Sequence, residues 1–275
     1  MQFTDRLEAF EYYLITEEKS KATQEKYLRD VRAFLVWCGE RELTKELVLQ
    51  YKEHLVASYA PASVNSMLAS LNSFLFYIER AECRVKQLKI QRQLFAREDK
   101  ELTKTEYRRL VAAAKDSRIS LVIQTICGTG IRVSELAYIT AEAVHLGKAL
   151  VSCKNKTRVI FIPAPVRKLL RGYMKKTGVT TGSVFVTRSG KPLDRSNIWK
   201  AMKALCLKAG IAAGKVFPHN LRHLFARTFY SIEKDIVHLA DLLGHSSINT
   251  TRIYTMDSGA QHIHSMEKVM ATLTT

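Results

Sequence analysis

The stretch ALVSCKNKTRVIFI, residues 149–162, is the one part of the sequence that is typical of a β-sheet. Residues 149–152 and 159–162 are short runs rich in apolar and β-branched side chains, and the polar segment 153–158 between them is typical of a hairpin turn. On both sides of this stretch, the apolar residues recur at helical spacing. The sequence therefore predicts a mainly α-helical protein with a small antiparallel sheet.

The N-terminal third of the chain is predicted to be a compact bundle of four helices. Each helix has apolar residues on one face, the pattern of a helix that packs against a core. The four are expected at residues 3–14, 27–38, 46–57 and 64–78. Together they form a first predicted domain, 1–85.

A basic segment, 86–99, is predicted to be a linker. The wider stretch 80–97 contains six basic residues and one acidic residue, Glu82, and it shows no apolar period. Beyond it, Thr103 and Glu106 have the spacing of a capping box, in which each side chain accepts a hydrogen bond from the other residue's backbone N–H. A second domain is therefore expected to occupy residues 100–275.

The composition favours a nucleic-acid partner. The chain has 43 Lys and Arg residues against 26 Asp and Glu residues, which gives a formal charge of +17. An excess of that size favours a polyanion over a small acidic substrate. No apolar run is long enough to span a membrane, and the acidic first 20 residues do not resemble a signal peptide. The five cysteines include no C-x-x-C pair, so we expect a soluble cytoplasmic protein with neither a zinc knuckle nor a disulfide framework.

Four short stretches of the second domain carry side chains suited to phosphoryl transfer. They read GIRVSEL at 130–136, CKNKTR at 153–158, PHNLRH at 218–223 and LGHSS at 243–247, and TRIY follows at 251–254. An arginine at a helix start adds a bidentate donor where the helix dipole already attracts phosphate. A histidine and an arginine three residues apart on one helix face can bind a phosphate and move a proton beside it.

Taken in order, these stretches resemble the active-site series of the tyrosine recombinase (integrase) family. The residues that carry the resemblance are Arg132, Lys154, His219, Arg222, His245 and Tyr254. The resemblance covers nearly the whole chain, and it implies an N-terminal SAM-like helical bundle that binds the core DNA site, followed by the α+β catalytic domain of that family. Within the family the chain is similar to the compact Xer and transposon-type enzymes, because it starts directly with the helical bundle.

The resemblance also implies a mechanism. Tyr254 would attack the scissile phosphate and form a 3′-phosphotyrosyl bond, while Arg132 and Arg222 hold the two non-bridging oxygens. His219 would accept the tyrosine proton, and His245 would hydrogen-bond the phosphate. This chemistry uses neither a metal nor ATP, and no cofactor is expected.

Two assignments within the motifs have alternatives. The family hairpin often reads G-K-G-N-K-x-R, and its first lysine is the catalytic one, which protonates the leaving 5′ oxygen. Lys154 aligns with that lysine if one residue is deleted from the family pattern. Lys156 is the alternative. The H-x-x-R spacing selects His219 and leaves His223 as a structural residue. Glu135, one turn past Arg132, is expected to orient its neighbours.

The implied partners are double-stranded DNA, with a recombination site built of inverted repeats, and further copies of the chain in a homotetramer on two duplexes. Ser258 and Gln261 have capping-box spacing, which predicts the start of a terminal helix. Apolar residues follow at helical spacing: Ile263, Met266, Met270 and Leu273. By resemblance this helix docks on the neighbouring protomer, and the enzyme acts at the nucleoid in the cytoplasm.

Two other functions fit part of the pattern. A type IB topoisomerase shares the Arg, Lys, His and Tyr chemistry but relaxes DNA without exchanging partners. A catalytically silent DNA-binding protein of the same fold would be expected to lack at least one of the six residues, and all six are present. The sequence favours a recombinase that integrates, excises or resolves DNA.

Overall fold

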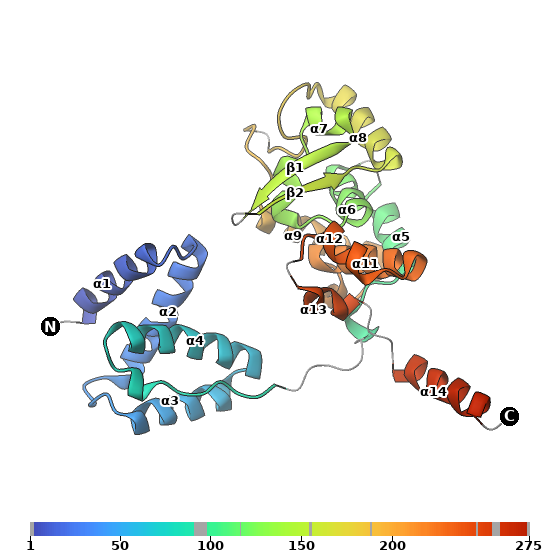
Figure 1. Cartoon of the computed structure of the whole chain (residues 1–275). Helices are drawn as coiled ribbons and strands as arrows, with labels where there is room; N and C mark the ends of the chain where they lie inside the picture. Colours follow the sequence, from blue (N-terminus) through green and yellow to red (C-terminus); the bar gives the residue numbers. More distant parts are fainter. Residues whose placement is uncertain are drawn as a thin grey trace. The chain divides into compact units, whose positions relative to one another are not determined.

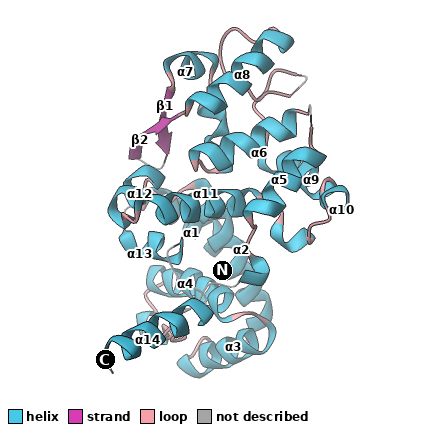
Figure 2. Ribbon diagram, turned by 90° about the vertical axis from the view of Figure 1, so that its right-hand side faces the viewer, coloured by secondary structure: helices cyan, strands magenta, loops and turns pink. Residues whose placement is uncertain are grey.

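The structure is a computed structural model of the chain, and it describes residues 3–90, 98–115, 117–153, 156–187, 189–245, 247–254 and 259–273. The chain divides into two units, Met1–Arg92 and Gln93–Thr275 (Figure 1). Each unit has its own hydrophobic core. Both units are mostly helical, and the described residues contain one two-stranded sheet, which is drawn in magenta in Figure 2. The predicted fold class, mainly α with a small antiparallel sheet, is confirmed. No helix in the described ranges is both long enough and apolar enough to cross a membrane.

Four helices form the N-terminal unit, as the apolar periodicity predicts. They are α1 (Phe3–Thr16), α2 (Lys21–Cys38), α3 (Lys45–Ser58) and α4 (Pro61–Tyr77), followed by the short 3-10 helix η1 (Ala81–Cys83). The hydroxyls of Ser20 and Thr44 cap α2 and α3 by accepting hydrogen bonds from backbone N–H groups three residues on. Helix α2 packs against α4, and Phe34, Leu68 and Phe74 are fully buried in the core of this unit.

A buried carboxylate lies between α2 and α4. The Oδ2 atom of Asp30 accepts hydrogen bonds from Lys26 Nζ at 2.6 Å and from Ser70 Oγ at 2.9 Å. The exposed Arg29 side chain places its Nη2 atom 3.3 Å from Asp30 Oδ1. Because a buried charge is costly unless it is paired and hydrogen-bonded, this network neutralises Asp30 within its own unit.

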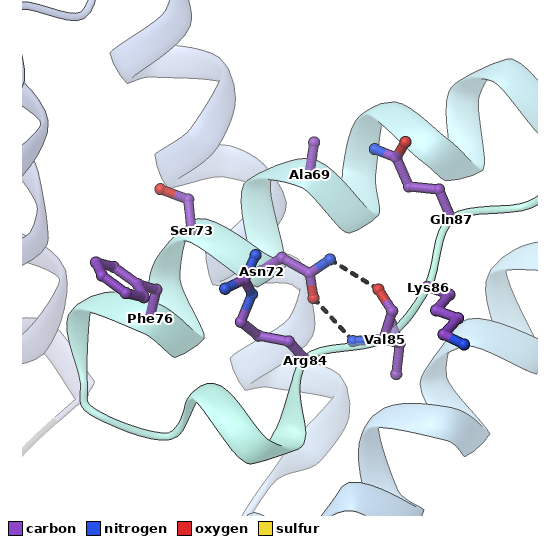
Figure 3. A pocket seen from close by; sticks show the side chains of 8 residues that line it. All are labelled: Ala69, Asn72, Ser73, Phe76, Arg84, Val85, Lys86 and Gln87. Atoms are coloured by element: carbon purple, nitrogen blue, oxygen red, sulfur yellow. Dashed lines mark hydrogen bonds between the residues drawn. The ribbon is translucent and has the colours of Figure 1, made fainter.

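The segment after α4 is more closely packed than its sequence suggests. The stretch 80–97 is expected to be an unpacked basic linker, but Val85 is buried in the core of the first unit and Leu88 packs against that core. Two asparagines of α4 hold this segment, because Asn72 pairs with the backbone N–H and C=O of Val85 and Asn65 pairs likewise with Leu88. Figure 3 shows the Asn72 pair beside a pocket between α4 and this segment. These side-chain-to-backbone hydrogen bonds fix the path of the chain as far as Leu88.

The C-terminal unit is a succession of helices interrupted by one hairpin. Its helices are η2 (Glu98–Lys100), α5 (Lys104–Ala113), α6 (Arg118–Thr129), η3 (Val133–Tyr138), α7 (Ala141–Leu146), α8 (Ala164–Thr177), α9 (Arg195–Ala204), α10 (Cys206–Ala209), η4 (Ala213–Lys215), α11 (Pro218–Glu233), α12 (Ile236–Leu243), α13 (Ile248–Thr251), η5 (Arg252–Tyr254) and α14 (Gly259–Leu273). The predicted capping box of Thr103 and Glu106 is present with both hydrogen bonds. The buried Asn220 of α11 donates from Nδ2 to the Lys100 carbonyl at 2.7 Å, which ties the start of the unit to α11.

The β-hairpin has longer strands and a shorter turn than the sequence predicts. Strand β1 (Lys148–Cys153) pairs antiparallel with β2 (Lys156–Phe161), in a register that places Val151 opposite Arg158. Polar residues assigned to the turn continue the ladder, because backbone pairing does not depend on apolar side chains. Side chains alternate across the sheet as in any strand, so Val151 is buried while its neighbour Leu150 is exposed.

Helix α6 runs through the core of the second unit. Its residues Val122, Ile123 and Ile126 are fully buried, and α8, α9 and α11 pack against it. The helix ends at Gly130, whose φ of +67° lies in the left-handed region that favours glycine. A Cβ atom on Gly130 would lie 2.4 Å from the Phe225 ring of α11, so glycine permits this close approach. The end of α6 is thereby brought against α11, and both segments carry predicted site residues.

Candidate active site

Arg132 follows the end of α6 and is held by Glu135. Its backbone N–H donates to Glu135 Oε2 at 2.7 Å, and its Nη1 atom donates to Glu135 Oε1 at 3.0 Å. The helix expected to start at Arg132 is the short 3-10 helix η3, in which residues i and i+3 lie directly above one another. Glu135 is buried, whereas the Arg132 side chain is 41% exposed. Arg132 is therefore anchored on one side and open to a ligand on the other.

Arg222 lies at the centre of the candidate site. Its side chain, from the first half of α11, is buried, and its Nη1 atom donates to the Gly130 carbonyl at 2.6 Å. Its Nη2 atom donates to the Leu243 carbonyl at 2.8 Å and lies 3.0 Å from His245 Nε2. The phenol of Tyr254 is close enough to this guanidinium to interact with it electrostatically. One buried side chain thus connects the end of α6 with the end of α12 and lies beside η5.

The buried Arg222 cation has only neutral partners. None of the ion pairs in the described part of the chain includes it, and the nearby charges of Arg132 and Arg158 are also positive. Burial and the charge of Arg132 lower the pKa of Arg222 to about 10, which leaves the side chain cationic at neutral pH. Because an unpaired buried charge is costly, this site is suited to an anion such as a phosphodiester.

His245 lies between Arg222 and Thr251. Its Nδ1 atom is 2.8 Å from the Oγ1 atom of Thr251, a buried residue of α13. Since a guanidinium can only donate, His245 Nε2 accepts from Arg222, and Nδ1 carries the proton that the threonine oxygen accepts. Burial, followed by the charges of Arg222 and Arg132, lowers the pKa of His245 to about 4. The neutral imidazole at pH 7 agrees with this tautomer.

The Tyr254 ring is packed among histidines. Tyr254 lies in η5 and its side chain is buried. Its ring centroid is 4.6 Å from that of His223, edge to face, and 5.9 Å from that of His245, stacked. His223 in turn lies 4.5 Å from His219, which Pro218 places in the first turn of α11. The three imidazoles and the phenol therefore form one continuous cluster.

The electrostatic surroundings keep the two histidines of α11 neutral at pH 7. His219 reaches the surface, but partial desolvation and then the charges of Arg222, Arg132 and Arg195 lower its pKa below the ordinary value. Desolvation, His219 and Arg222 lower the pKa of His223 to about 4. The buried Nδ1 atom of His223 has no hydrogen-bond partner among the described residues. A neutral His219 can accept a proton, which is what a general base requires.

The two lysine candidates belong to the hairpin tip. Lys154 lies outside the described residues. Lys156 is the first residue of β2, and its side chain also lies outside the description. The assignment of the catalytic lysine to Lys154, with Lys156 as the alternative, therefore stays a prediction.

Sequence reasoning missed two residues that contact the predicted ones. Arg158 of β2 lies 2.6 Å from Glu135, although the sequence assigns it to a polar turn. The alternation of side chains along β2 was the available signal, because Arg158 and the buried Ile160 are two residues apart and share a face. Thr251 is the hydrogen-bond partner of His245 Nδ1, but it belongs to a short polar run with no distinguishing pattern.

Five of the six predicted residues come together in the structure. They are Arg132, His219, Arg222, His245 and Tyr254. In the ranges that the structure describes, no three His, Cys, Asp or Glu side chains gather as metal ligands. The cluster combines two guanidinium groups, neutral imidazoles and a phenol, which together can bind a phosphate, attack it and accept a proton.

Comparison with known proteins gives two family matches and several relatives. The model described as the phage integrase family matches residues 100–260, and the model described as the phage integrase N-terminal SAM-like domain matches residues 7–84. Tyrosine recombinase XerA of Thermococcus kodakarensis is 31% identical over 261 residues, which cover 90% of this chain and 89% of that protein.

Two solved structures illustrate the likeness of fold. A crystal structure of XerA recombinase aligns with a TM-score of 0.53 and 25% identity, over 97% of this chain and 99% of that one. A lambda integrase tetramer bound to a Holliday junction aligns with a TM-score of 0.73 and 17% identity, over 92% of this chain and 77% of that one. At that identity the second comparison concerns the fold alone.

Proposed function

The chain belongs to the phage integrase family of tyrosine recombinases, and on that premise we propose that it recombines DNA at specific sites through a covalent 3′-phosphotyrosyl intermediate. The observation that carries this proposal is the buried Arg222 cation, which has neutral hydrogen-bond partners only and lies beside the phenol of Tyr254. A phosphotyrosyl bond retains the energy of the broken phosphodiester, so rejoining needs no nucleotide.

Tyr254 is the nucleophile of this mechanism. Its oxygen attacks the scissile phosphorus, the bond to the 5′ oxygen breaks, and the 3′ phosphate remains attached to the protein. A free tyrosine has a pKa of about 10 and reacts poorly at neutral pH. The nearby positive charge of Arg222 stabilises charge that develops on the phenolic oxygen. His219, which is neutral before the reaction, is the acceptor of the phenolic proton.

The two arginines bind the non-bridging oxygens. Arg132 offers its exposed donors and Arg222 its buried ones, so that two fixed cations face the charge that builds up on the phosphorane. His245 holds the Arg222 guanidinium in place, and it donates to the phosphate once that anion has raised the pKa of the imidazole. Lys154, or Lys156 in its place, protonates the leaving 5′ oxygen from the hairpin tip.

The enzyme acts as a homotetramer on two DNA duplexes whose sites contain inverted repeats, at the nucleoid in the cytoplasm, and it integrates, excises or resolves DNA. Helix α14 supports this assembly, because Met266, Val269 and Leu273 are 62%, 58% and 75% exposed and share one face at helical spacing. That face fits a neighbouring copy of the chain. The mass of the protein–DNA complex in solution tests this: a single chain on each duplex at saturation would contradict it.

A covalent-capture experiment tests the chemistry. The target site is first selected by the protein from a pool of random duplexes, and a nick beside the cleavage position then traps the adduct. Wild type is expected to form a protein–DNA adduct, while Tyr254→Phe binds the same duplex and forms none. Tyr230→Phe, a half-buried tyrosine of the same unit, is the matched control and should react like wild type.

Two results would contradict the proposal. An adduct that persists in Tyr254→Phe would move the nucleophile elsewhere, with Tyr230 as the next candidate. Relaxation of supercoiled plasmid without joined products from two labelled duplexes would assign a topoisomerase in place of a recombinase.

A further inference from the structure

Arg158 contacts two segments of the site besides its own strand. Its side chain is 14% exposed, and its Nη2 atom lies 2.6 Å from Glu135 Oε2. Its Nη1 atom donates to the Leu242 carbonyl, at the end of α12, at 2.6 Å. The two terminal nitrogens of one guanidinium therefore join strand β2 to η3 and to the turn that precedes His245.

Through Glu135, Arg158 reaches Arg132. The buried Oε2 atom of Glu135 accepts from both Arg158 Nη2 and the Arg132 backbone, and Oε1 accepts from Arg132 Nη1. Burial alone would raise the pKa of Glu135, but the Arg132 N–H group and the two guanidinium groups hold it below its usual value. The Glu135 carboxylate stays charged, and Arg158 fixes the orientation of this carboxylate, which in turn holds Arg132.

Through the turn 242–245, Arg158 also reaches Arg222. Gly244 has a left-handed φ of +65°, and a Cβ atom there would lie 2.4 Å from Arg158 Cδ, so the turn is closely fitted around this side chain. The carbonyl of residue 242 accepts from Arg158, and the next carbonyl, of Leu243, accepts from Arg222. A shift of Arg158 would therefore move the acceptor that holds Arg222.

We propose that Arg158 is a positioning residue for the recombination reaction, which aligns Arg132 through Glu135 and holds the turn before His245 without touching the DNA phosphate. The inference rests on the proposed function. Because Arg158 belongs to the hairpin that carries the candidate lysines, it also anchors that hairpin to the phosphate-binding residues. Lysine cannot replace it fully, since a single ammonium lacks the planar fork that reaches both partners.

A double-mutant cycle tests the route through Arg132. Arg158→Ala is expected to cleave the nicked duplex about a hundredfold more slowly, the size of effect that a misplacement of about 1 Å produces. Binding to the selected duplex should change by less than about threefold, because many other basic residues contact the backbone. The double variant Arg132→Ala/Arg158→Ala should be no slower than Arg132→Ala, because residues that act as one unit are not additive.

A second substrate separates alignment from a general loss of structure. A methylphosphonate at the scissile position has lost the negative charge that Arg132 faces, so it depends less on that residue. The defect of Arg158→Ala should therefore shrink to less than about tenfold on this substrate. The control is Arg227→Ala, which removes an arginine that is ion-paired with Glu101 in the same unit, and it should cleave both substrates like wild type.

Several outcomes would overturn the role of Arg158. They are wild-type cleavage by Arg158→Ala, additive effects in the double variant, and an equal loss on both substrates. If Arg158→Ala does not fold, Arg158→Lys is judged by the same comparisons, with an expected loss of about tenfold because one of two contacts is kept. A wild-type protein that forms no adduct would overturn the proposed function as well, whereas a wild-type adduct with unaffected Arg158 variants overturns this inference alone.

Discussion

A buried charge in the N-terminal unit and one in the C-terminal unit are treated in opposite ways. Asp30 is enclosed by Lys26 and Ser70, so its charge is cancelled by its own unit. Arg222 is more deeply buried, at 2% exposure against 6%, yet its hydrogen-bond partners are two carbonyls and an imidazole.

The difference separates a structural charge from a functional one. A buried ion that is fully paired, such as Asp30, has no capacity left for a ligand. A buried cation held only by neutral groups is fixed in direction while its charge remains available, which is the preorganisation that stabilises a developing anion. Tyr254, the proposed nucleophile, lies beside that charge.

The largest expected effect comes from removing the functional charge. Arg222→Ala should lower the cleavage rate by about a hundredfold or more, which corresponds to about 3 kcal/mol of lost transition-state stabilisation. Binding to the selected duplex should fall much less. Single-turnover cleavage and gel-shift titration measure the two effects. Millimolar phosphate should also raise the melting temperature of wild type but not of this variant, since only wild type has the anion site. A parallel loss of binding and cleavage would make Arg222 a general DNA contact.

Removing the structural charge should affect folding and leave the chemistry unchanged. Asp30→Ala removes the carboxylate that accepts from Lys26 and Ser70, which keep the Ser66 carbonyl as an acceptor. Since Lys26 is also partly exposed, the expected loss is about 1–3 kcal/mol of unfolding free energy. Arg29→Ala removes only the exposed partner and should cost less than about 1 kcal/mol. Urea denaturation measures both. A large loss in Arg29→Ala, or slower cleavage by folded Asp30→Ala, would weaken the contrast between the two units.

The smallest effect concerns how far the positive field of the second unit extends. His219, His223 and His245 all have pKa values below that of an ordinary histidine, with the last two at about 4. Cleavage should therefore hold through about pH 6.5 and fall below it by at most about tenfold per pH unit, as His219 becomes protonated and can no longer act as a base.

The free energy of unfolding should also fall as the pH is lowered. Between about pH 6.5 and about pH 4, the histidines of the unfolded chain bind protons, while those of the folded chain stay neutral. The stability present above pH 6.5 is therefore lost as the pH falls through this window. Single-turnover rates and melting temperatures over this range provide the measurement. A cleavage rate already halved at about pH 6.5, the behaviour of an unperturbed histidine, would show that the arginine charges do not reach His219.

The features that the sequence predicts well are local ones. The helices α1 to α4 follow from apolar periodicity, and the capping box of Thr103 and Glu106 follows from a spacing of three residues. The ordered motifs predicted which residues would meet, and Arg132, Arg222 and Tyr254 do lie in one cluster.

The features that it missed depend on contacts between distant positions. Strand alternation could place Arg158 on the inner face of the hairpin, but no local pattern identifies the carbonyl 84 residues away that it binds. The packing of Leu88 and Val85 depends on Asn65 and Asn72, whose amides substitute for missing backbone partners across 23 and 13 residues. The predicted hairpin turn is too long, because polar side chains give no sign that the backbone pairing continues to Cys153 and Lys156.

The asparagine pairs that hold the chain against α4 also set the length of the segment that joins the two units. Asn65 fixes Leu88 in the first unit, and Asn220 fixes Lys100 in the second. An extended chain spans at most about 3.6 Å per residue, so these two anchors cannot be more than about 43 Å apart. When one unit holds DNA, the other therefore stays within that distance of the same duplex, and its encounter with that duplex is intramolecular. We expect a catalytic unit that releases its phosphate to rebind the same site before the whole protein leaves the DNA.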